Sequence, residues 1–310
     1  MTKDQGSDRY TPPFRARLER RLRGEADWFM SCLLGRFCRF PNDQALRIFA
    51  MRRSGHHAIV NWICHHLSGK YFFLNDCKLG FSPFESAVWP SSVVKGFFGK
   101  HHLFRPGIER QGMFTYKGTL IFNYEEADLS KVPELMDIAQ EKVWIGPSRL
   151  RRDILILRDP FNLLASKLKW AYGVVDRPSK PTLEDVRLAR DLWKIYAREF
   201  LDKTRHLRNR ICISYNQWFA DKKYRDQLAA SLGFENRDLG VKEVAKWGPT
   251  LSQDSFDGLK FEGRAQEMRV LERWKVFEKD PFFLDLISDG ELQKLSYKIF
   301  GEINGTGSLF

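Results

Sequence analysis

Apolar runs and amphipathic stretches alternate along this chain from residue 46 onward. Short runs rich in β-branched and aromatic residues predict strands, and longer stretches with apolar residues three or four positions apart predict helices. The predicted strands cover residues 46–51, 71–74, 119–123, 153–157 and 210–215. The predicted helices cover residues 58–67, 129–140, 160–170 and 183–201, with two more between 271 and 300. This alternation predicts an α/β fold, a three-layer α/β/α sandwich around a central, mostly parallel sheet.

Three segments interrupt that alternation. Residues 1–45 form a polar, arginine-rich lead ahead of a single α/β domain at 46–310. Residues 77–118 look irregular, and residues 248–264 look like a loop. We expect a helix in the lead that packs its apolar stripe on the domain. The alternative is peripheral contact with a membrane surface, which acidic residues within the basic face disfavour.

Composition narrows the class of protein. The chain has 310 residues, of which 43% are hydrophobic and 29% charged, so it can bury a sizeable core and is not a disordered chain. Its net charge of +12 favours a polyanionic partner, which could be nucleic acid, anionic lipid or a phosphate- or sulfate-bearing small molecule. Charge alone does not choose among these; the motifs described below favour the small molecule rather than nucleic acid. No run approaches the roughly 18–20 apolar residues of a membrane span. Five irregularly spaced cysteines fit a reducing compartment, so we expect a cytoplasmic protein.

A first phosphate-binding corner is predicted at residues 51–58, where a strand passes through a short loop into a helix. The amino terminus of a helix attracts phosphate, Gly55 lets the backbone approach a ligand, and Arg53 adds positive charge. The loop lacks the Gly-Lys-Ser/Thr of a Walker A motif, which disfavours a magnesium-dependent kinase or ATPase. Alone, the segment would pass as an ordinary turn. The candidate ligand-binding residues are Arg52, Arg53, Ser54, Gly55, His56, His57 and Ala58.

A second corner is predicted after the buried strand at 153–157. Arg158 follows this strand, and Ser166 comes eight residues later in the next helix. Together they could clamp a second phosphate. The alternative is that Arg158 pairs with neighbouring Asp159 and that Ser166 is a small packing residue.

The two corners together resemble the P-loop sulfotransferase family, whose members transfer a sulfuryl group from 3′-phosphoadenosine 5′-phosphosulfate (PAPS). The family's first loop typically reads Lys-Ser-Gly-Thr-Thr, and residues 53–57 here read Arg-Ser-Gly-His-His. Its second site is a strand-end Arg with Ser eight residues later, often with Asp-Pro after the Arg, as in 158–166 here. A later Tyr-Glu-Asp-Leu strand end corresponds to 215–218, which lacks both acids. The resemblance spans roughly residues 46–300 and leaves an inactive relative open.

The resemblance implies where PAPS would bind. Arg53 and the backbone amides of the first loop would stabilise the departing 5′-phosphate, while Arg158 and Ser166 would hold the 3′-phosphate. In that family a late loop closes on the 3′-phosphate and adenine. By position, the candidates for that role are Lys260, Gly263 and Arg264.

A base must take the proton of the acceptor's hydroxyl or amine. Glu125 and Glu126 follow the strand at 119–123 and are the first candidates, with only one expected to face the ligand. Either could instead serve as a carboxylate at a helix amino terminus. His101 and His102 come second and Asp76 third.

No metal site is expected. The His56–His57 and His65–His66 pairs invite a zinc interpretation, but neighbouring histidines on a helix point in different directions, and no HExxH motif is present.

The sequence therefore favours a PAPS-dependent sulfotransferase whose acceptor is a saccharide, a glycolipid or a small molecule. An anionic acceptor would suit four basic residues of the 77–118 segment, namely Lys95, Lys100, Arg105 and Arg110. The alternatives are a non-catalytic polyanion- or nucleotide-binding P-loop protein and a nucleotide-phosphate transferase, that is, a kinase.

Overall fold

A computed structural model gives the fold of most of the chain. It describes residues 39–88, 93–96, 99–101, 115–136, 138–173, 180–243, 261, 263–303 and 305–309, together with nine positions between 18 and 37.

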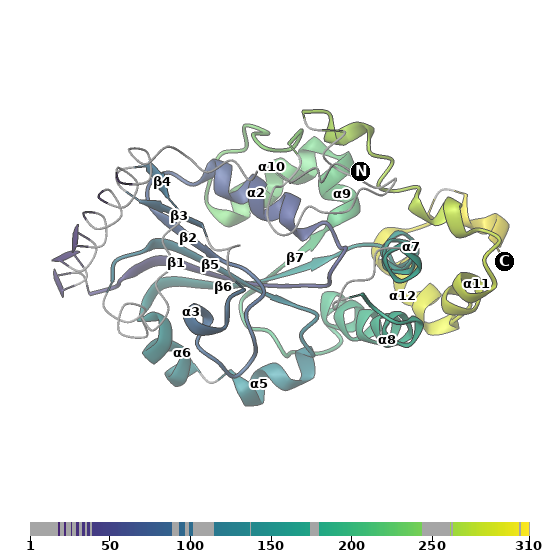
Figure 1. The fold of residues 1–310 in the computed structure, drawn as a ribbon, viewed down its shortest axis with the longest axis horizontal. Coiled ribbons are helices and arrows are strands. Elements are labelled where there is room, and N and C mark those ends of the chain that lie inside the picture. Colours follow the sequence, from purple (N-terminus) through teal and green to yellow (C-terminus); the bar gives the residue numbers. More distant parts are fainter. Residues whose placement is uncertain are drawn as a thin grey trace, which may run out of the picture.

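The fold is organised around a seven-stranded sheet in the order β4-β3-β2-β5-β1-β6-β7 (Figure 1). Five neighbouring strands, β2, β5, β1, β6 and β7, pair in parallel, and β3 and β4 extend the sheet with antiparallel pairing. The prediction of an α/β fold with a mostly parallel sheet is confirmed. The strands are β1 Asn42–Ala50, β2 Tyr71–Leu74, β3 Val93–Gly96, β4 Gly99–His101, β5 Gly118–Glu125, β6 Ser148–Leu157 and β7 Arg210–Ser214.

Helices cover both faces of the sheet. In Figure 1, α2, α9 and α10 lie on one side, and α5, α6 and α8 lie on the other. The α-helices are α2 His56–His66, α3 Pro83–Ser86, α5 Val132–Leu135, α6 Ile138–Ile145, α7 Pro160–Tyr172, α8 Leu183–Phe200, α9 Tyr215–Ala220, α10 Lys222–Leu232, α11 Pro281–Ile287 and α12 Gly290–Phe300. The 3-10 helices are η1 Leu129–Lys131, η3 Ala265–Glu267, η4 Arg273–Phe277 and η5 Thr306–Leu309.

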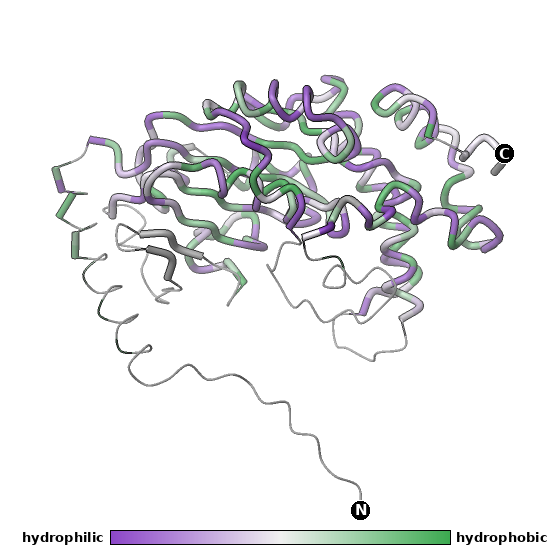
Figure 2. The backbone as a smooth tube through the Cα atoms, turned by 90° about the horizontal axis from the view of Figure 1, so that it is seen from above, coloured by the Kyte–Doolittle hydropathy of each residue, from purple (hydrophilic) through white to green (hydrophobic). Residues whose placement is uncertain are grey.

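The alternation of side chains along β1 explains this layering. Ala45 and Phe49 point to a core shared with α7, α8, α11 and α12. Leu46 and Ile48 point to the opposite face, where they pack with residues of α2, α9 and α10. Because successive strand residues face opposite sides, a strand that is apolar at nearly every position must be covered on both faces. Figure 2 shows much of the hydrophobic colour in these central strands.

The start of β1 differs from the prediction. The strand begins at Asn42, inside the segment predicted to be a separate lead, because its first residues are polar and hide the strand pattern. Asn42 is nevertheless fully buried, since its side-chain amide donates to the carbonyl oxygens of Ile145 and Gly146 at 2.9 and 3.2 Å. The fold therefore starts a few residues before residue 46.

Two other segments also differ from the prediction. The segment 77–118 is not irregular throughout, because it contains α3 and the antiparallel pair β3–β4. The single helix predicted at 129–140 is broken into η1, α5 and α6, since Met136 leaves helical geometry at φ −127° and ψ 65°. The two helices predicted between residues 271 and 300 are present as α11 and α12, after the additional 3-10 helix η4.

Most described apolar side chains of the predicted stripe in the lead are exposed. Phe29, Met30 and Leu33 are 61%, 37% and 41% exposed, whereas Leu34 is partly buried. The expectation that this stripe packs on the domain is therefore wrong for the three exposed residues. The arginines at 15, 17, 20, 21 and 23 lie outside the described residues. Among the helices that the structure describes, none is both long and apolar enough to cross a bilayer.

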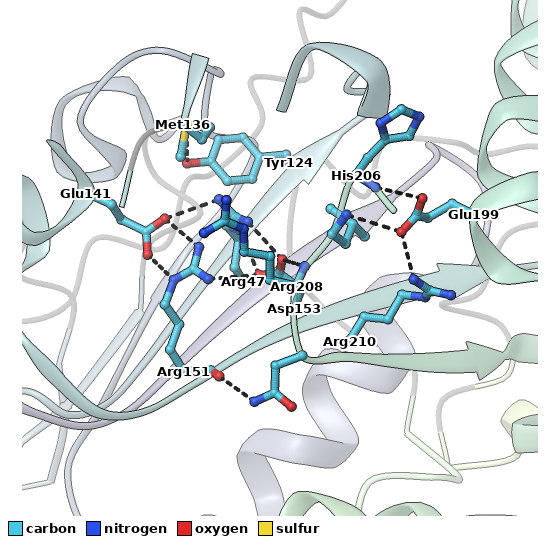
Figure 3. A network of polar contacts seen from close by, with 12 residues as sticks. Arg47, Tyr124, Met136, Glu141, Arg151, Asp153, Glu199, His206, Arg208 and Arg210 are labelled. Atoms are coloured by element: carbon cyan, nitrogen blue, oxygen red, sulfur yellow. Dashed lines mark hydrogen bonds and ion pairs between the residues drawn. The ribbon is translucent and has the colours of Figure 1, made fainter. Parts of the chain in front are cut away.

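A charged network fills one face of the sheet near the middle of β1 (Figure 3). The Arg47 guanidinium donates to both carboxylate oxygens of Asp153 at 2.9 and 2.8 Å and to Glu141 at 3.2 Å. Arg151 donates to the same Glu141 carboxylate at 2.5 and 2.8 Å. The buried charges of this region are thus paired within the fold.

Candidate functional site

The candidate site lies where the five parallel strands end. Parallel strands place their carboxyl ends at one edge of the sheet, and ligands of open α/β folds bind along that edge. The chain turns sharply there, because Arg53, Asp76 and Glu126 all have positive φ angles of 71°, 52° and 60°. Such backbone conformations are unfavourable for residues other than glycine and often accompany functional sites.

The first predicted corner forms a compact turn between β1 and α2. The Ser54 amide donates to the carbonyl oxygen of Met51 at 3.1 Å, and Ala58 closes the first helical turn onto Gly55 at 3.0 Å. Gly55 precedes α2 at φ 80° and ψ 11°, and no side chain caps the helix there. Among the described residues, no capping side chain therefore accepts from the first amides of α2.

Only glycine fits at position 55. A Cβ atom there would lie 2.2 Å from Cε2 of Tyr215, the first residue of α9. The loop between β1 and α2 is consequently pressed against the residue that follows β7. This close approach ties two strand ends together and fixes the height of the loop over the sheet.

The second predicted corner also forms. Arg158 follows β6, and Ser166 lies on α7 with its Oγ 3.5 Å from Arg158 Nη1. Asp159 does not pair with Arg158. Its carboxylate instead caps α7 by accepting from the Asn162 amide at 2.8 Å, and it also accepts from the Asn216 side chain at 2.9 Å. The alternative in which Asp159 neutralises Arg158 is therefore not what the structure has.

The two corners meet at Arg158. Its Nη1 donates to the carbonyl oxygen of Arg53 at 2.9 Å, and its Nη2 donates to the carbonyl oxygen of Val270. The guanidinium lies over the Tyr215 ring, 5.3 Å from the centroid. Arg158 is 1% exposed, its Nε has no hydrogen-bond acceptor, and no described carboxylate forms an ion pair with it. Burial lowers the pKa of this guanidinium.

The Arg53 side chain packs against α7, the helix that carries Ser166. Its guanidinium stacks over Trp170 of α7, 5.0 Å from the ring centroid. Trp170 comes four residues after Ser166, and residues four apart share one face of a helix. Arg53 and Arg158 therefore both approach one face of α7 rather than opposite sides of the sheet.

Arg273 joins the second corner and was not predicted from the sequence. Its backbone amide donates to Oδ1 of Asn162 at 2.7 Å, and its Nη1 donates to Ser166 Oγ at 3.0 Å. Arg273 opens η4 shortly after the predicted loop. The sequence pattern that could have pointed to Arg273 is a basic residue shortly after the predicted loop. Many other basic residues of this chain fit the same pattern, so it does not single out Arg273.

The predicted late-loop residues are not brought to this corner by any described contact. Lys260 lies outside the described residues. Gly263 forms a turn at φ 77°, and the exposed Arg264 pairs with Glu267 at 3.2 Å. The late segment contacts Arg158 and Ser166 through Val270 and Arg273 instead, because the chain returns to α7 only at the start of η4.

A third group of polar side chains lies at the ends of β1, β2 and β5. Arg52 bridges two carboxylates, with its Nε 3.0 Å from Glu125 Oε2 and its Nη2 2.8 Å from Asp76 Oδ2. The other oxygen of Glu125, Oε1, lies 3.1 Å from His56 Nε2 and 3.4 Å from His57 Nε2. Arg52 thus points to the acidic side of the edge and away from the second corner.

The electrostatics of this group follow from its burial and charges. His56 and His57 hold the pKa of Glu125 well below its usual range, overcoming the opposing effect of burial. Burial, together with neighbouring His56, lowers the pKa of His57 to about 4. Burial and the Glu125 charge raise the pKa of Asp76. At neutral pH, Glu125 is ionised and His57 is uncharged.

The remaining base candidates fare differently. Glu126 forms an ion pair with Lys167 of α7. His101 ends β4, an outer strand separated from β1 by three others, and its side chain lies outside the described residues, as does all of His102. Glu125 is therefore the predicted carboxylate that the structure places beside the first corner. The reasoning that adjacent histidines diverge is wrong for His56 and His57, because side chains in the first turn of a helix lean back toward its amino terminus, where Glu125 lies.

Comparisons with known proteins do not indicate a function, so the geometry of the site is the main evidence for one. No protein-family model matches the chain, and no curated protein matches it either.

Proposed function

We propose that this chain is a sulfotransferase that moves a sulfuryl group from PAPS to a hydroxyl or amine of an acceptor. One observation carries the proposal: Arg158, buried and without a carboxylate partner among the described residues, donates to the carbonyl oxygen of Arg53 and lies beside Ser166. Two motifs 105 residues apart in sequence thereby build one cationic corner.

The residues present suit a nucleotide with two separate phosphate groups. The uncapped amino terminus of α2 and the Arg53 side chain suit the 5′ end, because helix amides and a guanidinium both favour phosphate oxygens. Arg158, Ser166 and Arg273 suit the 3′-phosphate. The Nε of Arg158 is a buried donor with no acceptor, which an anionic ligand at this corner would supply.

PAPS, when bound, supplies an activated sulfuryl group whose leaving group is the nucleotide bisphosphate. The protein's part is to orient the nucleotide and to stabilise negative charge, as in phosphoryl transfer. Arg53 and the first amides of α2 would hold the leaving 5′-phosphate. Of the predicted bases, Glu125 lies nearest the first corner, with Oε1 3.1 Å from His56 Nε2. Because its pKa is held well below the usual range, it is a weak proton acceptor, and we assign it to positioning the acceptor's hydroxyl or amine.

The test is a calorimetric titration with 3′-phosphoadenosine 5′-phosphate, without magnesium, beside the same titration with ATP. We expect micromolar binding of the bisphosphate and much weaker binding of ATP. A preference for magnesium-ATP would favour the kinase alternative, and no binding of either nucleotide would contradict the proposal.

A matched pair of variants localises the binding. Arg273→Met removes a donor to Ser166, whereas Arg264→Met removes an exposed arginine that pairs with Glu267. Loss of a charge-assisted hydrogen bond costs about 1.5–3 kcal/mol, roughly a 10- to 150-fold weaker affinity. We expect that loss for Arg273→Met alone. If the two variants bind 3′-phosphoadenosine 5′-phosphate with equal affinity, the second corner does not bind the nucleotide.

A further inference from the structure

Three donor atoms converge at the ends of β1 and β5. They are Nε2 of His56, Nε2 of His57 and Oε1 of Glu125, and all lie within 4.8 Å of one another. Both histidines belong to the first turn of α2, and their rings are 4.0 Å apart. Their ring nitrogens lie at 3.1 and 3.4 Å from the same carboxylate oxygen, so the three side chains surround one small volume.

We propose that His56, His57 and Glu125 bind a divalent transition-metal ion of the zinc class. Imidazole nitrogen and carboxylate oxygen are ligands that such ions prefer. This inference goes beyond nucleotide-dependent transfer. Its ligands are distinct from Arg158, Ser166 and Arg273 of the second corner, although His56 and His57 begin the helix of the first corner.

The separations suit a tetrahedral ion. Zinc binds imidazole nitrogen at about 2.0–2.1 Å and carboxylate oxygen at about 2.0–2.2 Å, which places tetrahedral ligand atoms roughly 3.3–3.5 Å apart. The two distances to Glu125 Oε1, 3.1 and 3.4 Å, lie close to that range without any movement. Three protein ligands leave a fourth position for water or a substrate oxygen, as in catalytic rather than structural zinc sites.

Surrounding side chains orient two of the three ligands, His56 and Glu125. Ser54 Oγ lies 3.4 Å from Nδ1 of His56, which leaves Nε2 as the nitrogen directed at Glu125. Arg52 takes the other oxygen of Glu125, so Oε1 is the one turned toward the histidines. Such contacts behind the ligands fix their orientation and support metal affinity.

The local charge also favours a cation. Among the described side chains, the carboxylates of Glu125 and Asp76 flank a single guanidinium, that of Arg52. Glu126 adds no further negative charge, because Lys167 neutralises it. An ion here would hold water or a substrate oxygen in its fourth position and lower the pKa of that group.

The experiment titrates the full chain with Co²⁺ after chelator treatment and follows visible absorption, since cobalt reports nitrogen and oxygen ligands by its colour. We expect one equivalent to bind with a saturable band that Zn²⁺ displaces. His57→Asn and Glu125→Gln should each weaken Co²⁺ binding by at least about 10- to 100-fold, which is what loss of a partner behind a ligand costs. His57 is 27% exposed, so its variant can be tested even where Glu125→Gln fails to fold.

The matched control is His65→Asn. His65 lies on the same helix but pairs with Glu243 at 2.9 Å, away from the proposed ligands. We expect this variant to bind Co²⁺ as the unaltered chain does. Absence of a saturable band, or equal loss in the His57 and His65 variants, would overturn the proposal. Binding of 3′-phosphoadenosine 5′-phosphate, measured separately, reports on the sulfotransferase proposal whatever the cobalt result.

Discussion

Two buried arginines on neighbouring strands are treated in opposite ways by this fold. Arg47, in the middle of β1, donates to two carboxylates, those of Asp153 and Glu141 (Figure 3). Arg158, just after β6, has only carbonyl and hydroxyl oxygens as acceptors in the described part of the chain, and its Nε has none. Both side chains are almost completely buried, at 3% and 1% exposed.

The difference separates a charge that serves the fold from one that is kept for a ligand. Burying an ion is costly unless an opposite charge and hydrogen bonds compensate it. The network around Arg47 supplies that compensation internally. At the carboxyl edge of the sheet, the compensation of the Arg158 charge by the described residues is incomplete. A fold would tolerate this where a bound anion supplies the missing negative charge. The comparison can be tested by breaking each arrangement in turn.

The largest effect is expected for Arg47→Met. Removing the guanidinium leaves the two buried carboxylates of Asp153 and Glu141 to share Arg151, and breaking one side of a buried pair costs about 3–5 kcal/mol. Urea denaturation should show that loss in the free energy of unfolding. Arg198→Met is the control, because its ion pair with Glu291 is exposed and should cost about 0–1 kcal/mol. If the two variants lose similar amounts of unfolding free energy, the network around Arg47 does not stabilise the fold as expected.

Gly55→Ala should come next. The residue has φ 80°, and a Cβ would meet the Tyr215 ring at 2.2 Å. The left-handed backbone costs about 1–2 kcal/mol, and overpacking costs about 1–3 kcal/mol more. Gly233→Ala is a matched control, since Gly233 has φ 87° but no atom within 4 Å of a Cβ. The melting temperature of Gly55→Ala should therefore be well below that of Gly233→Ala. Equal melting temperatures would mean that the contact with Tyr215 does not restrict position 55.

Arg158→Met should reverse the pattern of Arg47→Met. It removes a buried charge that has no ion-pair partner among the described residues, so we expect the free energy of unfolding to change by only about 1 kcal/mol. Affinity for 3′-phosphoadenosine 5′-phosphate should fall by roughly 10- to 150-fold, the value of a charge-assisted hydrogen bond. Denaturation and calorimetry on one preparation measure both quantities. A large loss of stability with unchanged nucleotide affinity would make Arg158 a structural residue like Arg47.

The sequence was sufficient to predict the elements that lie deepest in this fold. The apolar runs of β1 and β6 and the long amphipathic α8 have patterns that only one secondary structure satisfies. Arg158 and Ser166 could be paired in advance because a strand end and a helix face two turns later are both local features. Their juxtaposition needed no knowledge of distant segments.

The parts that were missed depend on contacts between distant segments. Asn42 starts a strand although it is polar, because carbonyl oxygens of residues 145 and 146 receive its amide. Arg273 reaches Ser166 from a segment 107 residues later. The meeting of His56 and His57 with Glu125 depends on the register of β1 beside β5, which pairs Ala50 with Glu125. No periodicity in the sequence encodes these meetings.

The smallest expected effect concerns the pH dependence of stability and comes from His66. Like Arg158, His66 is a buried basic side chain, but its imidazole can lose its proton and become neutral, whereas a guanidinium stays charged. Its Nδ1 donates to the carbonyl oxygen of Trp62 at 2.7 Å, and its Nε2 accepts from the Arg237 amide at 2.9 Å. The ring must therefore be neutral in the folded state, and burial, with a smaller contribution from Arg237, lowers its pKa below 6.5.

The sign of the pH dependence follows from that lowered pKa. The unfolded chain takes up a proton near pH 6.5 while the folded ring resists it, so stability is fully present above this pH and declines as the pH falls below it. Urea denaturation at pH 7.5 and 5.5 should show a smaller decline for His66→Gln than for the unaltered chain, although the variant is less stable at both. His65→Gln controls for the neighbouring exposed imidazole. An unchanged decline in His66→Gln would mean that other groups cause the acid sensitivity, and that a buried base in this fold need not be neutral to be tolerated.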